Sequence, residues 1–420
     1  MKIGNNPLDA IYAESIKPIR NQMRRYDYLS LLNSILMYLN APLPGDRQKD
    51  LQRLPWVVER LAIWLFADKP AEYGTKIPAE HDLRRLVDMA WRAADKVYEA
   101  DREIKQLGLY VRQAWLPQIP YQMSLDSHAF SFQIYLLKRL PANSKLIRFL
   151  NEKAGMQILD YFKIALVYWT HSLTDKPWFN YGFMQAIAYA FPVEEQRQFL
   201  DSITFHLQNF KDQCSDRTIK LDEWFQPTYF YQTPCILHRG AAVPMGRPTF
   251  RRYFEGLLSD WIAASGRSDL RQDFDRLIES YVAETLSRAG LTFMRENETK
   301  KLPGMTRVAD FLVVEPTGLV LFEVKNKALS EAVPASREPH ELASRLKATV
   351  VKGVGQLADT EAALKRLPAY KGKKFFRILV TATNLWIAEA KWLKDESGSN
   401  SKTWIMSIRE TLNKVYHPAV

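Results

Sequence analysis

The sequence predicts a multidomain α+β protein, in which a mostly α-helical N-terminal domain precedes an α/β domain with a mixed central sheet. Apolar residues recur at helical spacing through roughly the first 240 residues, whereas after Gly290 they form short runs typical of strands. From there the order of elements is strand, strand, strand, helix, strand. We expect a helical domain at 1–222, a linker and connecting helix at 223–265, and the α/β domain at 266–420.

Apolar stripes predict the helices of the N-terminal domain. Segments 54–66, 81–100 and 146–169 have the 3.6-residue period of helices that bury one face, and another helix begins at Pro192. The aromatic residues in these stripes are expected in the core. The stripe of 81–100 comprises Leu83, Leu86, Val87, Ala90, Ala94 and Val97, and that of the Pro192 helix comprises Phe199, Leu200, Ile203, Leu207 and Phe210.

A change of composition follows at 223–248. The stretch holds four prolines and two glycines among β-forming residues, which predicts a linker with short extended pieces. Segment 251–264 then resumes as a helix. Segment 273–289 is a second, clearly amphipathic helix, and Gly290 is its expected C-cap.

Four strands are expected in the α/β domain. They are 291–295, 309–315, 319–325 and 375–383, and the proline and glycine of 316–318 predict a hairpin turn between the second and third. A long helix is expected at about 341–366, between the third and fourth strands. These elements predict a mixed sheet flanked by helices.

Charge and cysteine content restrict the function classes. The net charge of +11 favours a polyanionic partner, although solubility alone is the simpler explanation. Segment 361–394 holds eight basic residues against two acidic ones, which favours phosphate contacts. Two cysteines, no apolar N-terminal segment and no apolar run of membrane-spanning length predict a cytoplasmic protein without a membrane partner. The lysines expected to contact a nucleic-acid backbone are Lys371, Lys373 and Lys374.

An acid and a base close the most apolar strand. Glu323 and Lys325 are two residues apart, so they share one face of the strand 319–325. Asp310 opens the partner strand of the expected hairpin and should lie near Glu323. Two carboxylates at a strand end suit Mg²⁺ or Mn²⁺ rather than zinc. With the Lys325 ammonium, they supply the groups needed to hydrolyse a phosphodiester.

This arrangement resembles the PD-(D/E)xK nuclease superfamily, which has the restriction-endonuclease-like fold. Asp310 is followed after twelve residues by Glu323-Val324-Lys325. The preceding helix carries Ile278-Glu279-Ser280-Tyr281-Val282, and the following helix carries Gln356 with Lys352 one turn earlier. The resemblance covers about 266–383 and not the N-terminal half. Two positions depart from the family pattern: Ala309 stands where proline is usual, and Thr360 where an aromatic residue is sometimes found.

The resemblance implies a role for each matching residue. Asp310, Glu323 and Glu279 would hold Mg²⁺ or Mn²⁺, Lys325 would act on the water or the phosphate, and Gln356 would support the site. Lys352 would contact nucleic acid. For Glu279 a solvated surface acid is the alternative, because Glu279 and Glu284 flank the apolar stripe of their helix on opposite sides.

The function that the resemblance implies is metal-dependent hydrolysis of DNA, with bacterial defence or restriction as an association. The helical half would then sense a trigger, grip DNA, or bind a protein partner or a second copy. A non-catalytic nucleic-acid-binding or assembly subunit on the same fold is the alternative. No Walker-type loop, HExxH or GxSxG motif is present. A zinc site is a weaker alternative, with irregularly spaced candidates: His206, Cys214, Cys235 and His238.

Overall fold

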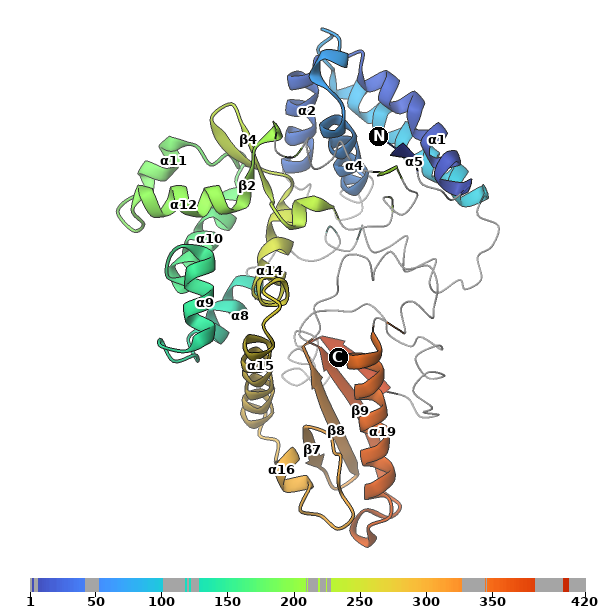
Figure 1. The fold of residues 1–420 in the computed structure, drawn as a ribbon, viewed down its shortest axis with the longest axis vertical. Helices are drawn as coiled ribbons and strands as arrows, with labels where there is room; N and C mark the ends of the chain where they lie inside the picture. The colour runs from blue at the N-terminus through green and yellow to red at the C-terminus, as the bar shows by residue number, and fades with distance from the viewer. Residues whose placement is uncertain are drawn as a thin grey trace. The chain divides into compact units, whose positions relative to one another are not determined.

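The computed structural model describes residues 2–3, 7–41, 53–100, 118, 121, 128–208, 210, 218–219, 224, 228–326, 344, 346–381 and 403–407. The protein has an α+β fold, as the sequence predicts, with helices and two mixed sheets (Figure 1). It divides into two compact units. The first comprises Met1–Tyr135 and Leu150–Leu257, and the second comprises Leu136–Phe149 and Leu258–Val420.

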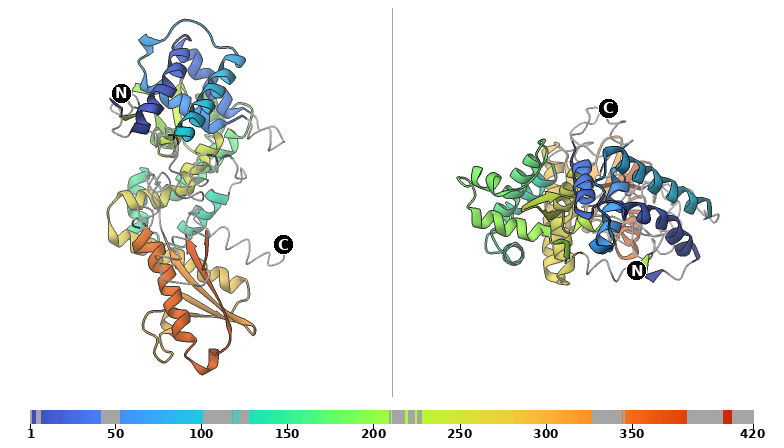
Figure 2. Two further views of the ribbon diagram at one scale, coloured as in Figure 1. Left: turned by 90° about the vertical axis from the view of Figure 1, so that its right-hand side faces the viewer. Right: turned by 90° about the horizontal axis from the view of Figure 1, so that it is seen from above.

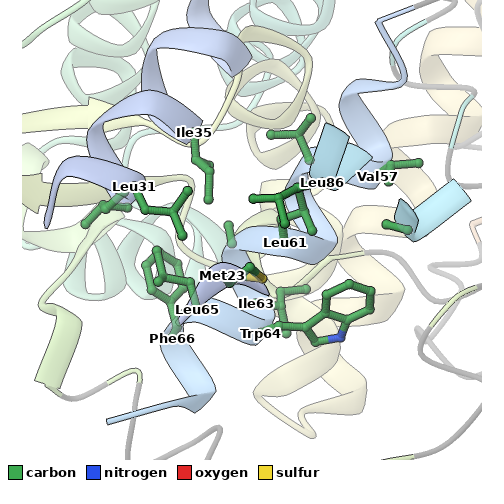
Figure 3. Close-up of a cluster of buried hydrophobic side chains, with 14 of the residues drawn as sticks. Met23, Leu31, Ile35, Val57, Leu61, Ile63, Trp64, Leu65, Phe66 and Leu86 are labelled. Atoms are coloured by element: carbon green, nitrogen blue, oxygen red, sulfur yellow. The ribbon is translucent and has the colours of Figure 1, made fainter. Parts of the chain in front are cut away.

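Helices dominate the first unit. Its core gathers the apolar faces of α1, α2, α4 and α5, and in α4 every residue from Trp56 to Phe66 is buried. Figure 3 shows Met23, Leu31 and Leu61 meeting in this core. The α-helices that lie wholly or partly in this unit are α1 (Pro7–Met23), α2 (Tyr28–Asn40), α4 (Pro55–Ala67), α5 (Glu80–Ala100), α8 (His128–Leu137), α9 (Lys145–Ala154), α10 (Ile158–Ser172), α11 (Tyr181–Ala186), α12 (Val193–Ile203) and α14 (Arg247–Ala264).

Two helices predicted for this half are confirmed, and two others are shorter than expected. Segments 54–66 and 81–100 correspond to α4 and α5. Segment 146–169 is broken into α9 and α10 at Gly155, whose φ of 70° is the left-handed conformation that ends a helix. The Pro192 helix ends at Ile203 because the next two residues pair with a strand instead.

A small mixed sheet occupies the segment expected as a linker. Strand β4 (Cys235–His238) pairs antiparallel with β5 (Ala241–Pro244) and parallel with β2 (Thr204–Phe205). Ile236 and Val243 are fully buried in the core of the first unit, so this part of 223–265 is packed structure and the linker prediction is wrong there. The connecting helix is confirmed as α14. A further parallel pair joins β1 (Lys2–Ile3) to β3 (Thr218–Ile219).

The second unit is built on a five-stranded sheet in the order β10-β9-β8-β7-β6. Strands β6, β7 and β8 pair antiparallel, whereas β8, β9 and β10 are parallel. Parallel neighbours need a crossover, and α19 supplies it between β8 and β9, along which it lies in Figures 1 and 2. The elements are α15 (Ser268–Arg288), β6 (Phe293–Arg295), α16 (Glu296–Thr299), β7 (Phe311–Val314), β8 (Gly318–Lys325), a π-helical segment (Lys347–Val351), α19 (Lys352–Leu364), β9 (Lys374–Thr381) and β10 (Thr403–Ser407).

The four strands and two helices predicted for this unit are confirmed, with ends that differ by a few residues. Gly290 has a φ of 74° after α15, as expected of its C-cap. The short helix α16 and the strand β10 were not predicted. Ala382 and Thr383 of the fourth strand, and most of the predicted helix before 346, lie outside the described residues. None of the described helices is both long and apolar enough to cross a bilayer.

Candidate active site

The β7–β8 hairpin brings Asp310 opposite Glu323. The last pair of its register is Phe311 with Phe322, and one further step along both strands pairs Asp310 with Glu323. The Asp310 Oδ2 atom accepts a hydrogen bond from the backbone N–H of Val324 at 2.7 Å. The hairpin expected from the sequence therefore holds two carboxyl groups side by side at the end distant from its turn.

Lys325 is bound to Glu323 on the same face of β8. Its Nζ atom donates to Glu323 Oε1 and forms an ion pair with it. The Glu323 residue is 0% exposed. Its second oxygen, Oε2, has no hydrogen-bond partner of normal geometry within the described part of the chain, although the backbone of Asp310 is near enough to lower the pKa of this carboxyl group in part. A buried carboxylate oxygen without a partner is unfavourable, so this atom is the one that a bound cation or donor would satisfy.

Helix α19 covers these two side chains through a glycine. A Cβ atom on Gly353 would lie 2.7 Å from Leu379 Cδ1, 3.4 Å from Lys325 Cγ and 3.5 Å from Glu323 Cγ. The first distance is shorter than real Cβ contacts, and Leu379 is fully buried. Glycine is therefore needed here for the helix to approach the strand end. Lys352 begins the same helix and is exposed next to the site.

Helix α15 supplies a third carboxyl group, that of Glu279. Its charge is coupled to those of Asp310 and Lys325, so the structure places this side chain toward the strand end. The other candidate on the helical wheel, Glu284, is bound instead to Arg139, with a second ion pair to Arg288. The Glu279 side chain is partly buried, and its role as a ligand rather than a surface acid stays a prediction.

The three carboxyl groups have raised pKa values. Burial raises the pKa of Glu323 to about 8, with a further contribution from the charge of Asp310, although Lys325 opposes it. Burial also raises the pKa of Glu279 to about 7, again with Asp310 adding to it. The pKa of Asp310 is raised by burial and lowered in part by the Val324 N–H. The single ammonium of Lys325 therefore does not balance the three carboxyl groups of Asp310, Glu323 and Glu279.

The Lys325 ammonium acts on all three carboxyl groups. Burial acts to lower its pKa, but the charges of Glu323, Asp310 and Glu279 outweigh this and raise it. Lys325 is therefore protonated at neutral pH and is held in place by its bond to Glu323.

Gln356 supports the site by fixing the chain that enters it. Its Nε2 atom donates to the backbone carbonyl of Val308 at 2.7 Å. One turn later on α19, the Thr360 Oγ1 atom accepts the N–H of Ala309 at 2.9 Å and donates to the carbonyl of Gln356 at 2.7 Å. The two side chains hold the peptides just before Asp310, and the positioning role of Gln356 stays a prediction.

The three lysines expected to bind phosphate lie away from the carboxyl groups. Lys374 pairs with Gly318, at the opposite end of β8 from Lys325. The two ends are seven residue steps apart, which is roughly 23 Å at the usual rise per residue. Lys371 and Lys373 precede Lys374 and are at the same end. They can contact only phosphates distant from the one at the site.

Sequence reasoning missed four residues around the site. Asp275 lies one turn before Glu279 on α15, and the side chain of Asn326 hydrogen-bonds to it. The signal for Asp275 was its spacing of four residues from Glu279, which puts both on one helix face. The signal for Asn326 was its place after Lys325. Thr360 was noted only as a departure from the family pattern, and Gly353 had no signal, because the roles of both depend on how α19 packs.

Among the described residues, no group of three or more His, Cys, Asp or Glu side chains is arranged to hold a metal ion. The acidic site therefore offers the Asp310 and Glu323 pair rather than a complete cage. Of the zinc candidates, Cys214 lies outside the described residues, and Cys235 is a buried free thiol three residues from His238 on one strand, so the two alternate in direction.

No protein-family model matches this chain, and no match was found among curated proteins or solved structures.

Proposed function

We propose that the second unit is a metal-dependent nuclease domain that hydrolyses the phosphodiester bonds of DNA. The observation that carries the proposal is the meeting of Asp310, Glu323 and Lys325 at one strand end, with one oxygen of the fully buried Glu323 left without a hydrogen-bond partner of normal geometry among the described residues. Such a grouping has a high free energy unless a ligand neutralises it. This supports a functional role rather than a structural one.

The residues present fit Mg²⁺ or Mn²⁺. Their donor atoms are carboxylate oxygens, which these hard cations prefer, and the pKa values of the three acids are raised as expected of a site that lacks its counter-charge. Asp310 and Glu323 would hold the ion together with water, and Glu279, whose pKa responds to the charge of Asp310, is the third acid that we propose as a ligand once the ion is bound. When bound, the ion would lower the pKa of an attacking water and stabilise charge on the phosphate oxygens.

The remaining chemistry belongs to side chains of this chain. The Lys325 ammonium, oriented by Glu323, would bind a phosphate oxygen whose charge increases in the transition state. The Val324 N–H fixes the Asp310 carboxylate directly. Gln356 and Thr360 of α19, which we call the α19 clamp, fix the backbone of residues 308–309 just before it. Fixing both groups in advance reduces the reorganisation that the reaction would otherwise require.

The wider architecture we propose is a helical N-terminal domain joined to a restriction-endonuclease-like domain. DNA is favoured over RNA only by the resemblance, and the net charge of +11 supports a polyanionic substrate in general. We also propose a cytoplasmic location, since the chain has only two cysteines. A defence role, with the helical domain binding a trigger, a partner or a second copy, remains an association.

The test is cleavage by the purified full chain. Supercoiled plasmid, linear duplex, single-stranded DNA and RNA are incubated with Mg²⁺, Mn²⁺ or EDTA. We expect cleavage of at least one DNA substrate that EDTA abolishes and that both Glu323→Gln and Glu279→Gln lack. Glu284→Gln is the matched control, because Glu284 is on the same helix as Glu279 but bound to arginines. Cleavage by Glu323→Gln at the parent rate would place the activity elsewhere.

A non-catalytic nucleic-acid-binding subunit is the second candidate. The observation in its favour is that the described residues contain no group of three or more acid, histidine or cysteine side chains arranged for a metal. In that case DNA would bind equally with Mg²⁺ and with EDTA, and no substrate would be cut. Binding without cleavage under every condition above would favour this candidate.

A further inference from the structure

The helical first unit contains a pocket of about 610 Å³. This volume is within the range of natural small-molecule sites. The wall is built from the C-terminal part of α2, the last turn of α10, the loop 175–180 and the first turn of α11. The lining includes Met37, Asn40, His171, Trp178, Asn180 and Phe183.

Aromatic rings form the apolar part of this wall, and they are fixed in position. His171 stacks on Phe183 with ring centroids 3.8 Å apart and planes at 15°. The Asn180 side chain accepts the N–H of Phe183 at 3.0 Å and so caps α11. Trp178 packs edge-on against the ring of His238. Rings held in this way need no further ordering when a ligand binds. His171 covers one face of Phe183, so Trp178 is the ring on which a flat ligand would stack.

Asn40 gives the pocket a specific polar group. Its amide nitrogen donates to the carbonyl oxygens of Leu36 at 3.0 Å and Pro244 at 2.7 Å, so its orientation is determined. Asn40 is 5% exposed, and its Oδ1 atom has no hydrogen-bond partner within the described residues. The only polar atom that Asn40 can offer a ligand is therefore an acceptor, and a ligand must bring an N–H or O–H donor to use it.

The charges of the lining exclude a strongly charged ligand. Asp175 and Lys176 are neighbours at the exposed rim of the pocket, and their opposite charges cancel. His171 is uncharged at neutral pH, since burial lowers its pKa. The lining as a whole thus has no excess of either sign, unlike a site built for a phosphate or a carboxylate.

We infer that this pocket is a binding site for a neutral, planar heteroaromatic molecule that carries an N–H donor. The ring stacks on Trp178, and its N–H binds Asn40 Oδ1. The inference does not depend on the proposed nuclease activity, because every lining residue belongs to the first unit.

The experiment compares matched ligands on the full chain. Indole and 1-methylindole differ in one N–H, and adenine adds a purine with several donors; each is titrated by saturation-transfer NMR. We expect saturable binding of indole and adenine, with 1-methylindole about five-fold weaker, as for the loss of one hydrogen bond. Trp178→Leu should weaken all three ligands. Tyr189→Leu, which removes an aromatic ring that is 92% exposed and does not line the pocket, should weaken none.

Three outcomes would overturn the inference. The first is that none of the compounds binds saturably, and the second is that Trp178→Leu leaves their binding unchanged. The third is equal affinity for indole and 1-methylindole, which would show that Asn40 does not select an N–H donor. Asn40→Ala, if it folds, should remove the difference between the two indoles. If it does not fold, the comparison on the parent chain still decides the matter.

Discussion

The Asp310 carboxylate accepts the backbone N–H of Val324, the residue between Glu323 and Lys325, at 2.7 Å. This bond ties the start of β7 to the end of β8 and keeps two acidic side chains close together. Retaining the bond while removing the charge separates the electrostatic role of Asp310 from its structural one.

Asp310→Asn makes that separation, because the amide oxygen can still accept the Val324 N–H. We expect the cleavage rate to fall by about two to three orders of magnitude, as for the loss of a charged group at a reacting centre. Without divalent ion the variant should melt at the same or a higher temperature than the parent, since repulsion with Glu323 is relieved. Scanning calorimetry with and without Mg²⁺ checks this. A parent-like rise of the melting temperature with Mg²⁺ would contradict a metal role for Asp310.

Lys325→Met retains the length of the side chain without its charge. The variant should still bind Mg²⁺ but lose about two to three orders of magnitude in cleavage rate, because Lys325 would act on charge that develops in the transition state. Lys325→Ala should be equally inactive, whereas Lys325→Arg tests whether any cation suffices. Metal titration by calorimetry and single-turnover cleavage separate the two effects. Loss of metal binding in Lys325→Met would instead mean that Lys325 orders the ligands.

Stability without metal should decrease as the pH rises from about 4.5 to about 8. The folded-state pKa values of Glu279 and Glu323, about 7 and about 8, exceed the ordinary value of 4.5, so the native state binds more protons than the unfolded state in this interval. Saturating Mg²⁺ should reduce the decrease, and Mg²⁺ affinity should increase with pH over the same interval. Urea unfolding at several pH values, with and without Mg²⁺, measures both.

Glu59 provides the control for this pH dependence. It is buried in the first unit beside Thr249, and burial raises its pKa to about 7, so it contributes a slope of the same sign. Glu59→Gln should reduce the pH dependence of the free energy of unfolding by the same amount with and without Mg²⁺. If Glu323→Gln leaves the Mg²⁺-sensitive part intact, the ion binds elsewhere.

The second unit shows which parts of the fold can be predicted from the sequence. Its β7–β8 hairpin was predictable because two apolar runs flank a proline and glycine turn, and the spacing then determines which acids face each other. The strand β10 was not, because a single run of five residues, Thr403–Ser407, is too short for its periodicity to identify a strand. Its pairing with β9 is a long-range contact that local patterns do not encode.

The same limit applies within the site. Asp310, Glu323 and Lys325 were identified by strand spacing, which is a local property. The choice between Glu279 and Glu284 was open on the helical wheel and depends on what packs against each face of α15. The break of segment 146–169 at Gly155 was missed because periodicity continues across it, although its glycine was the available signal.

Thr360→Val tests the clamp on the chain before Asp310. The substitution keeps the shape and removes the hydroxyl that accepts the Ala309 N–H, which leaves a buried donor unpaired. We expect a loss of about 1 to 3 kcal/mol in the free energy of unfolding. We also expect a lower cleavage rate with unchanged substrate affinity. Thr360→Ser retains the hydroxyl and is the matched control. Full activity in Thr360→Val would mean that the clamp serves only stability.

The lysines at the far end of β9 test how substrate lies on the second unit. Replacing Lys371, Lys373 and Lys374 with alanine should weaken DNA binding similarly for all sequences. It should also reduce the slope of log K against log salt by up to about 0.9 for each phosphate contact that is lost. The effect should require a duplex long enough to reach both ends of β8, because Lys374 pairs with Gly318 and not with the site. Fluorescence anisotropy measures the binding of duplexes of about 6 and about 24 base pairs, which are shorter and longer than β8. Lys352→Ala is the comparison: because Lys352 is next to the site, this variant should bind both duplexes more weakly. An unchanged salt slope on the longer duplex would show that these three lysines do not face the substrate.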